Sequence, residues 1–550
     1  MVGSLKGQTF LHGAIILLVA NVIVKVIGAI FRIPIYNLIG GEGWSYYQTA
    51  YSLYVYFFAI STAGLPVAIS RMVAVANMEQ NYEEERKIFR LSLLIFIAVG
   101  VTGTGIMIAA SRAFAETARN PDAYYSVLIL APTLFFVCLT AAFRGYFQGK
   151  QNMIPTAVSE IIESLGKLLI GIGAAWYALS RGYELHIVAA FAVSGLTVGV
   201  AAGVIFLTVT KLVAARYERY HRREHTPSGK PASNKFKVSV RKNGEILRDI
   251  IKIALPITLS ASLISLSGII DTFLMTRRLI DAGYTEAAAR AAFGDYSAQA
   301  VSIFNFPNVL VIPFAVSIIP VLSMQFAKKN TAAIKSTVES TFRVVSFISM
   351  PCAFGIASMS RPILNLIFTD REAVEATAPL LSVLAFAVVF VAMVAVTNSM
   401  LQAQKQERKT VISMGCGIVI KFVASYVLIG IPAVGRFGTP IATFLCYFTI
   451  TGINFYFLVK YTGIVPPVRR TFMKPFMASA IMSICTILIY MLLDNLLNGS
   501  GIATVLAIII AAGIYLILTL MFRTLTREDV LLLPKGAKLY EALKKRNLID

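Results

Sequence analysis

Long apolar runs separated by short polar segments form the main pattern along the chain. Fourteen of these runs reach the roughly 17–25 residues that a helix needs to cross a bilayer. They lie near 9–31, 45–70, 88–111, 123–143, 155–179, 187–210, 250–276, 298–325, 340–360, 376–400, 411–430, 438–459, 473–493 and 501–522. The pattern predicts an all-α polytopic membrane protein with fourteen transmembrane helices. The first run has no small-residue cleavage site, so we expect a retained helix and not a signal peptide.

One long polar stretch divides the first twelve runs into two sets of six. Residues 211–249 are rich in Lys and Arg and include Pro227 and Pro231, which is typical of a basic linker. We therefore expect two six-helix lobes, a final helix pair and a polar tail. The expected parts are 1–210, the linker 211–249, 250–460, the helix pair 461–523 and the tail 524–550.

The two sets of six helices share features at a constant separation. At an offset of 254 residues, Thr156 and Lys167 coincide with Thr410 and Lys421. This indicates an internal duplication, and the even helix number per half gives both halves the same orientation, a parallel repeat about an axis along the membrane normal. The alternative is that membrane helices resemble one another by composition alone.

The composition agrees with a membrane protein and excludes other classes. Hydrophobic residues make up 57% and charged residues 14%, and the mean hydropathy is +0.73. Soluble chains average about 25% charged residues, so a soluble protein is excluded, as is a disordered one. With 5 Cys in 550 residues, a disulfide scaffold is excluded too.

The net charge of +22 has two possible meanings, nucleic-acid binding or membrane topology. With the N-terminus placed in the cytoplasm and the loops assigned alternately, the positive excess falls on cytoplasmic segments, whereas external loops and spans are close to neutral. This distribution predicts that both termini are cytoplasmic. We therefore expect no nucleic acid as a partner, and the basic surface to face the cytoplasm.

Several charged residues fall inside the predicted helices. A charge at mid-bilayer costs about 2.5–3.5 kcal/mol, so such residues should face a cavity or each other. Glu160, Glu163 and Lys167 share one helix face by their spacing, as do Asn21 and Lys25. The other candidates are Asp271 and Lys421 within helices and Arg32, Arg71 and Arg144 at helix ends. The alternatives are structural ion pairs between helices and, for the arginines, snorkelling to the interface.

No motif indicates catalysis. The chain has no G-x-x-x-x-G-K-[ST] and no H-E-x-x-H sequence, and no nucleophile motif in a recognisable setting. We therefore expect a transporter and not an enzyme, with no catalytic residue, no cofactor and no metal site. A membrane-embedded glycosyltransferase would need clustered acidic metal ligands in a large external loop, which the longest such loop, 277–297, lacks.

One segment carries a family resemblance. Residues 143–167 read F-R-G-Y-F-Q-G-K-Q-N-M-I-P-T-A-V-S-E-I-I-E-S-L-G-K. This closely resembles a signature of the stage V sporulation protein B-like polysaccharide exporters, which share the multidrug/oligosaccharidyl-lipid/polysaccharide (MOP) superfamily with the MurJ lipid II flippases. Arg144, Gly145, Gln148 and Gly149 match its loop, and Pro155, Thr156, Ala157, Ser159, Glu163 and Lys167 match its helix. Glu160 stands where Gln is usual, and Lys25 and Lys167 stand where Arg is common.

The resemblance implies a V-shaped fold of two lobes around a cationic central cavity, alternating access, and a groove for a polyprenyl tail in 461–523. The cavity would contain Asn21, Lys25, Arg32 and Arg71. A switch at the lobe interface would contain Arg144, Gln148, Glu160, Glu163, Lys167, Asp271 and Lys421.

The leading functional hypothesis is a flippase in the bacterial cytoplasmic membrane for an undecaprenyl-diphosphate-linked cell-wall precursor, with lipid II as the best single guess. Exporters of another lipid-linked polysaccharide repeat unit and cation-coupled multidrug exporters are the alternatives. The expected partners are a lipid-linked oligosaccharide substrate, membrane lipids and cell-wall synthesis proteins, and we expect a monomer.

Overall fold

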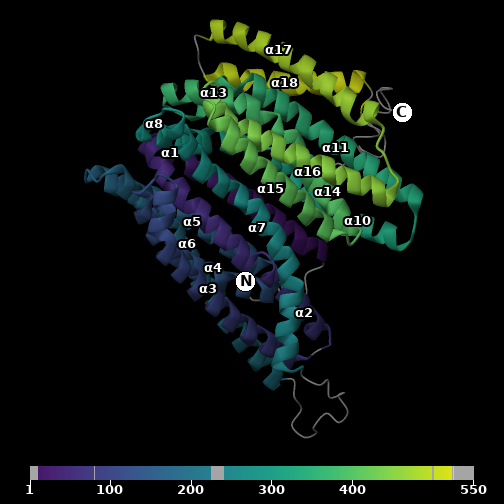
Figure 1. Cartoon of the computed structure of the whole chain (residues 1–550). Helices are drawn as coiled ribbons and strands as arrows, with labels where there is room; N and C mark the ends of the chain where they lie inside the picture. Colours follow the sequence, from purple (N-terminus) through teal and green to yellow (C-terminus); the bar gives the residue numbers. More distant parts are fainter. Residues whose placement is uncertain (1–9, 80, 225–240, 498–500, 523, 525–550) are drawn as a thin grey trace. The chain divides into compact units, whose positions relative to one another are not determined.

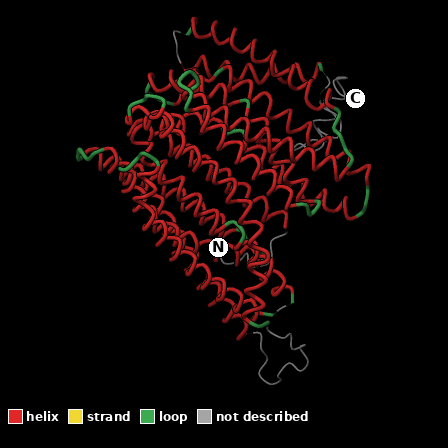
Figure 2. The backbone as a smooth tube through the Cα atoms, in the orientation of Figure 1, coloured by secondary structure: helices red, strands yellow, loops and turns green. Residues whose placement is uncertain are grey.

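The computed structural model describes residues 10–79, 81–224, 241–497, 501–522 and 524, and within these ranges the chain is helical with no β-strand (Figures 1 and 2). Parts of the predicted linker (225–240) and nearly all of the predicted tail (525–550) lie outside the described residues. The all-α class is therefore confirmed for the described chain.

The first six helices contain the predicted spans of the N-terminal half. They are α1 (Phe10–Thr62), α2 (Leu65–Met78), α3 (Tyr82–Thr117), α4 (Ala123–Gly149), α5 (Ile154–Ser180) and α6 (Leu185–Glu224). Helix α1 has a kink at Gly40, where φ is 65° and ψ is −173°. That conformation is accessible essentially only to glycine, so the kink is encoded locally.

The remaining helices contain the other predicted spans. They are α7 (Asn243–Asp281), α8 (Glu286–Asp295), α9 (Val301–Asn305), α10 (Asn308–Ala327), α11 (Thr331–Ser358), α12 (Ser360–Ile367), α13 (Arg371–Ala385), α14 (Ala387–Ala403), α15 (Glu407–Ile429), α16 (Gly438–Thr462), α17 (Lys474–Leu496) and α18 (Gly501–Met521). A π-helical turn at Tyr296–Ala300 connects α8 to α9. Pro307 then separates α9 from α10, because proline has no N–H with which to continue the helix.

The helices support fewer spans than the fourteen expected. Eleven described helices are long and apolar enough to cross a membrane, or twelve if the bent pair of α13 and α14 counts as one span. One reason is that α1 and α2 form a single 60-residue candidate, Val19–Met78, which contains most of both of the first two predicted spans. The other is that α5 carries Glu160, Glu163 and Lys167 and is not among the candidates. The protein is multi-pass, and the number fourteen is not confirmed.

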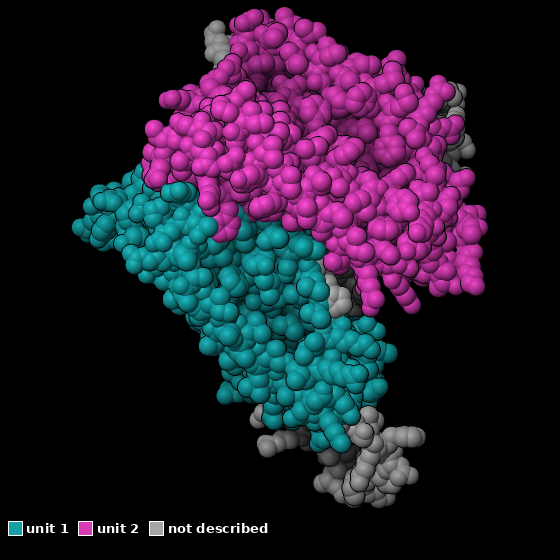
Figure 3. Space-filling model, in the orientation of Figure 1, with its two compact units in different colours: residues 1–39, 43–269 teal, residues 40–42, 270–550 magenta. Residues whose placement is uncertain are grey.

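The chain divides into two compact units, which Figure 3 shows in different colours. Unit 1 comprises Met1–Ile39 and Gly43–Ile269, and unit 2 comprises Gly40–Glu42 and Ile270–Asp550. One boundary falls inside α7, so residues 250–269, which we assigned to the second lobe, belong to unit 1. The predicted lobes and their repeat stay a prediction.

Glycines bring α5 and α6 of unit 1 unusually close. A Cβ atom on Gly166 would lie 2.4 Å from Gly199 Cα, and one on Gly199 would lie 2.5 Å from the carbonyl oxygen of Glu163. Small residues at such contacts let helix backbones approach closely in a membrane protein. The contact fixes the part of α5 that carries Glu163 and Lys167.

Unit 2 is centred on an apolar core shared by α10, α11 and α14. Val311, Leu322, Val338, Phe342 and Met400 are buried together there. Helices α17 and α18 pack beside α11, with Met482 and Tyr515 buried next to Phe347 and Phe354 (α17 and α18 are yellow in Figure 1).

Candidate functional site

An ion pair connects the C-terminal part of α4 to the N-terminal half of α5 in unit 1. Arg144 Nη2 lies 2.7 Å from Glu163 Oε1, with the two side chains 17% and 16% exposed. Arg144 Nε also donates a hydrogen bond to Ser159 Oγ at 2.9 Å. The hydroxyl of Ser159 in turn donates to the carbonyl oxygen of Thr156 at 2.7 Å. Glu163 therefore pairs with Arg144 of a neighbouring helix and not with Lys167 one turn further along α5.

Lys167 instead lies against aromatic rings of α1. Its ammonium nitrogen is 4.6 Å from the ring centroid of Phe31, 4.9 Å from that of Tyr51 and 5.8 Å from that of Tyr47. These distances are within the range of cation–π attraction. The rings stabilise the positive charge of Lys167. A carboxylate would neutralise that charge, whereas the rings do not.

A second cation, Arg32, also lies against aromatic rings of α1. Its guanidinium carbon is 5.5 Å from the ring centroid of Trp44. Trp44 stacks on Tyr47 with centroids 4.8 Å apart, and Tyr47 stacks on Tyr51 at 5.8 Å. Arg32 and Lys167 therefore contact one continuous row of rings, which we call the aromatic row and define as Phe31, Trp44, Tyr47 and Tyr51.

Sequence reasoning missed Phe31 and Trp44 as members of the site. The signal was present in part: Trp44, Tyr47 and Tyr51 recur at spacings of three and four and therefore share one face of α1. An interfacial aromatic belt would give the same pattern. Contact with a lysine on α5 could not be derived from α1 alone.

The other predicted cavity residues lie apart from this row. Asn21, Lys25 and Arg71 are exposed, and among the described residues no hydrogen bond or ion pair joins them to Arg32 or Lys167. Asn21 Nδ2 donates to the carbonyl oxygen of Leu17 on its own helix at 3.0 Å. The structure therefore brings together only Arg32 and Lys167 of the predicted cationic residues.

Two further predicted residues flank the Arg144–Glu163 pair. Gln148 is half-buried near the end of α4, one turn beyond Arg144. Glu160 is half-buried on α5, and within the described chain its Oε2 atom is buried with no hydrogen-bond partner. Both lie near the ion pair in sequence without joining it.

In unit 2, α7 and α15 are connected by a second embedded ion pair. Lys421 Nζ donates a hydrogen bond to Asp271 Oδ2 at 2.7 Å, and the Lys421 side chain is only 2% exposed. The other carboxylate oxygen, Asp271 Oδ1, is buried with no hydrogen-bond partner within the described ranges. A charged pair this well buried is expensive to break, because either residue alone would be an unpaired charge.

The described residues contain no group of three or more His, Cys, Asp or Glu side chains that could hold a metal ion. The contacts that the described residues do make are electrostatic and aromatic: cations on ring faces and ion pairs between helices, beside half-buried amide and carboxylate groups.

Two family models match parts of this chain, and curated bacterial proteins match it over nearly its whole length. A family model described as "Polysaccharide biosynthesis protein" matches residues 10–326, and one described as "MatE" matches 256–427. Stage V sporulation protein B of Bacillus subtilis (strain 168) is 24% identical over 539 residues, which cover 96% of this chain and 98% of that protein. Lipid II flippase MurJ of the same organism is 23% identical over 530 residues, which cover 92% and 94%.

Solved structures share the fold. An inward-facing multidrug resistance MATE family transporter of the MOP superfamily superposes with a TM-score of 0.65 at 15% identity, covering 82% of this chain and 98% of that one. The lipid II flippase MurJ in its inward closed conformation gives 0.62 at 14% identity, covering 92% and 98%.

The helices and these likenesses define a multi-pass membrane protein with the fold of the MOP-superfamily transporters. Within that class, the chain belongs to the polysaccharide biosynthesis protein family, whose model matches more than half of its length. The resemblance of residues 143–167 is thereby confirmed at the level of the superfamily and family.

Proposed function

We propose that this protein is a flippase that moves an undecaprenyl-diphosphate-linked cell-wall precursor across the bacterial cytoplasmic membrane by alternating access, with lipid II as the first candidate. The observation that supports this most is the contact of two cations, Arg32 and Lys167, with a single aromatic row in unit 1.

The chemistry of that pair suits a diphosphate. Because the rings stabilise the cations without cancelling their charge, the pair retains its attraction for an anion. An arginine guanidinium offers bidentate hydrogen bonds to phosphate oxygens, and a lysine ammonium supplies a compact charge. The exposed Lys25 and Arg71, with Asn21, would extend the site along α1 and α2.

We assign the two ion pairs a switching role. Arg144–Glu163 and Asp271–Lys421 each connect two helices within one unit, and each sits in a low-dielectric setting where making or breaking it changes the energy strongly. Gln148 and Glu160 would supply alternative partners when the first pair opens. Membrane potential would act on these charges, at about 2.3 kcal/mol per charge per 100 mV.

An apolar hollow in unit 2 supports binding of a polyprenyl tail. It has a volume of about 560 Å³ and is lined only by apolar side chains of α11, α13, α14, α16 and α17. Phe354, Phe386, Phe390, Phe444 and Phe476 contribute rings to it. We therefore extend the proposed tail groove of 461–523 to include this hollow.

The similar proteins support more than one headgroup for the transported lipid. The relative named lipid II flippase MurJ supports lipid II, whereas the family description supports another polysaccharide precursor. A different lipid-linked repeat unit is therefore the second candidate. A cation-coupled drug exporter is the third, supported by the match of residues 256–427 to the MatE model.

Native mass spectrometry of the purified full-length protein tests the substrate class directly. We expect a co-purifying polyprenyl-diphosphate lipid, whose fragments identify the glycan. The Lys167→Gln variant should lose this lipid, while a control, Lys335→Gln on α11, should keep it. A wild-type protein that binds no polyprenyl lipid when lipid II and its analogues are added, but does bind cationic drugs, would refute the flippase.

Topology forms a separate part of the proposal. We propose that both termini are cytoplasmic and that the protein is a monomer in the bacterial cytoplasmic membrane. Reporter fusions that fluoresce only in the cytoplasm should be active at residue 550 and inactive in the 277–297 segment. Activity at the internal fusion would reverse the orientation.

A further inference from the structure

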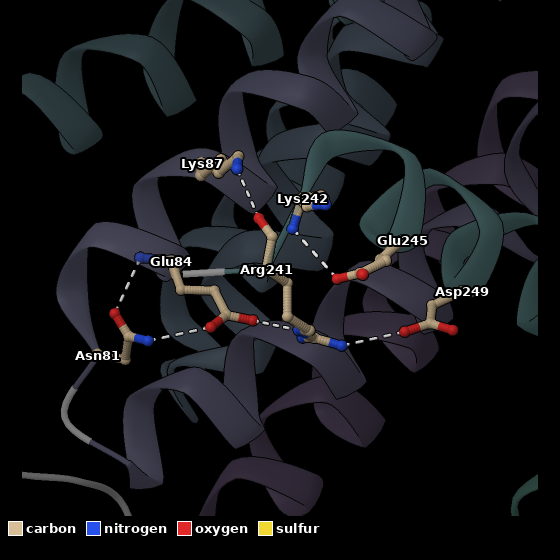
Figure 4. A network of polar contacts seen from close by, with 7 residues as sticks. All are labelled: Asn81, Glu84, Lys87, Arg241, Lys242, Glu245 and Asp249. Carbon is tan, nitrogen blue, oxygen red and sulfur yellow. Dashed lines mark hydrogen bonds and ion pairs between the residues drawn. The ribbon is translucent and has the colours of Figure 1, made fainter. Parts of the chain in front are cut away.

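A polar clamp fixes the start of α7 against α3 (Figure 4). Arg241 Nε donates to Glu84 Oε1 at 2.5 Å, and Arg241 Nη1 donates to Asp249 Oδ2 at 3.0 Å. Lys87 Nζ donates to the carbonyl oxygen of Arg241 at 2.5 Å. Glu84 is nearly fully buried and also accepts from Asn81 Nδ2 at 3.0 Å. The clamp compensates the charge of Arg241 with two carboxylates.

The first turn of α7 is held by its own capping contact and by apolar packing. The backbone N–H of Lys242 donates to Glu245 Oε2 at 3.2 Å, as Figure 4 shows, which satisfies one amide at the helix start. Ile246, Ile250 and Ala254 are buried in the apolar core that α7 shares with α2, α3 and α4. One face of this helix segment is therefore fixed inward.

The opposite face carries two cations with no partner in the described structure. Arg248 and Lys252 are exposed, four residues apart, and form no hydrogen bond or ion pair with another described residue. The nearby carboxylate of Asp249 accepts a hydrogen bond from Arg241, so Asp249 does not pair with Arg248 or Lys252. No described carboxylate therefore compensates these two side chains.

An apolar stripe runs from these cations along the same side of α7. Leu247, Ile251, Leu255 and Leu259 are 43%, 52%, 55% and 52% exposed and recur every four residues. A shallow hollow of about 530 Å³ lies at the N-terminal end of the stripe, lined by Gly244, Leu247, Arg248, Ile251 and Lys252. Gly244 leaves this hollow open, since a Cβ atom there would meet no atom within 4 Å.

We propose that this hollow binds the phosphate headgroup of an anionic phospholipid, with an acyl chain lying along the Leu247–Leu259 stripe. The apolar part of α7 begins at this turn, so Arg248 and Lys252 lie at the level of lipid headgroups. Basic residues at that level attract anionic lipids. The stripe favours a lipid over a free phosphate ion, because only the lipid covers the exposed leucines and isoleucine.

Lipid binding by the purified full-length protein tests the site. Native mass spectrometry would measure retention of phosphatidylglycerol against phosphatidylcholine. We expect one phosphatidylglycerol to be retained preferentially and its apparent affinity to fall about tenfold in the R248Q/K252Q double variant. The matched control, K328Q/K329Q, removes two exposed cations from the turn after α10 and should bind normally. An equal loss in both variants, or no loss in either, would overturn the proposal.

Two further measurements separate the hollow from general charge attraction. Gly244→Leu fills the hollow while leaving both cations in place, so it should weaken phosphatidylglycerol binding several-fold with no change in melting temperature. Inorganic phosphate at millimolar concentration should not displace the lipid. Normal binding by Gly244→Leu, or displacement by phosphate, would overturn the assignment. If the double variant does not fold, Gly244→Leu and the single variant R248Q still decide the question.

Discussion

Lys421 on α15 donates a hydrogen bond to Asp271 on α7 across 2.7 Å, although the two residues are 150 positions apart in the chain. The pair is buried in unit 2 at the end of a helix that begins in unit 1. It therefore attaches α15 to the segment of α7 that follows the boundary between the two units.

We expect the protein to lose more stability when one partner of the Asp271–Lys421 pair is replaced than when both are replaced. Lys421→Met should destabilise the protein by about 3–5 kcal/mol, because it leaves the carboxylate of Asp271 buried and unpaired. The double variant Asp271→Leu/Lys421→Met should recover most of that loss. Thermal unfolding in detergent, followed by size-exclusion chromatography, measures both. A single variant that melts with the wild type would refute the buried pairing.

A double-mutant cycle should identify the partner of Glu163. Because Arg144 Nη2 lies 2.7 Å from Glu163 Oε1, the Arg144→Met/Glu163→Gln cycle should give a coupling energy of about 1–3 kcal/mol. The Glu163→Gln/Lys167→Met cycle should give less than about 0.5 kcal/mol, despite the favourable i,i+4 order. Denaturation of the wild type, the two single variants and the double variant of each cycle provides the measurement. A larger coupling between Glu163 and Lys167 would contradict the geometry.

The aromatic row can be tested without removing a charge. Tyr51→Leu removes a ring 4.9 Å from Lys167 Nζ and should slow lipid flipping in proteoliposomes about tenfold, because the ammonium loses a cation–π contact worth about 0.5–2 kcal/mol. Tyr51→Phe keeps the ring face and should flip nearly normally. Equal flipping rates for the Leu and Phe variants would show that the ring does not hold the lysine for transport.

The close packing of α5 on α6 predicts that alanine is tolerated at one glycine of this helix pair and destabilises the protein at another. Gly199→Ala places a Cβ atom 2.5 Å from the carbonyl oxygen of Glu163, so the helices must separate, at a cost of about 1–3 kcal/mol. Gly173→Ala, on α5 where no atom lies within 4 Å of the new methyl, should be neutral or slightly stabilising. Melting temperatures of the two variants compare them, and a stable Gly199→Ala protein would contradict the observed helix contact.

Much of the helix placement could be predicted from periodicity and length. The predicted span 155–179 corresponds to α5 at Ile154–Ser180, and 438–459 to α16 at Gly438–Thr462. The number of crossings could not be predicted as well. Helix α1 passes through the polar residues between the first two predicted spans with a kink at Gly40 and no intervening loop, because helical hydrogen bonds do not require apolar side chains.

The candidate site was predicted only in part. The sequence identified Arg32, Lys167, Glu163, Asp271 and Lys421 as embedded or near-embedded charges, and the structure places each in a polar or aromatic contact. Its spacing argument joined Glu163 to Lys167, which share a face of α5. The actual partners come from α4 and α1, and no local pattern specifies which neighbouring helix faces a given turn.

By itself, the sequence determined that this chain is a helical, multi-pass membrane protein with a family signature in residues 143–167, because hydropathy, charge and short motifs are local properties. The tertiary structure decided which charges meet. Embedded charges must be compensated by whatever the adjacent helix presents, so the pairing of Arg144 with Glu163, of Lys421 with Asp271 and of Lys167 with the aromatic row depends on how the helices pack.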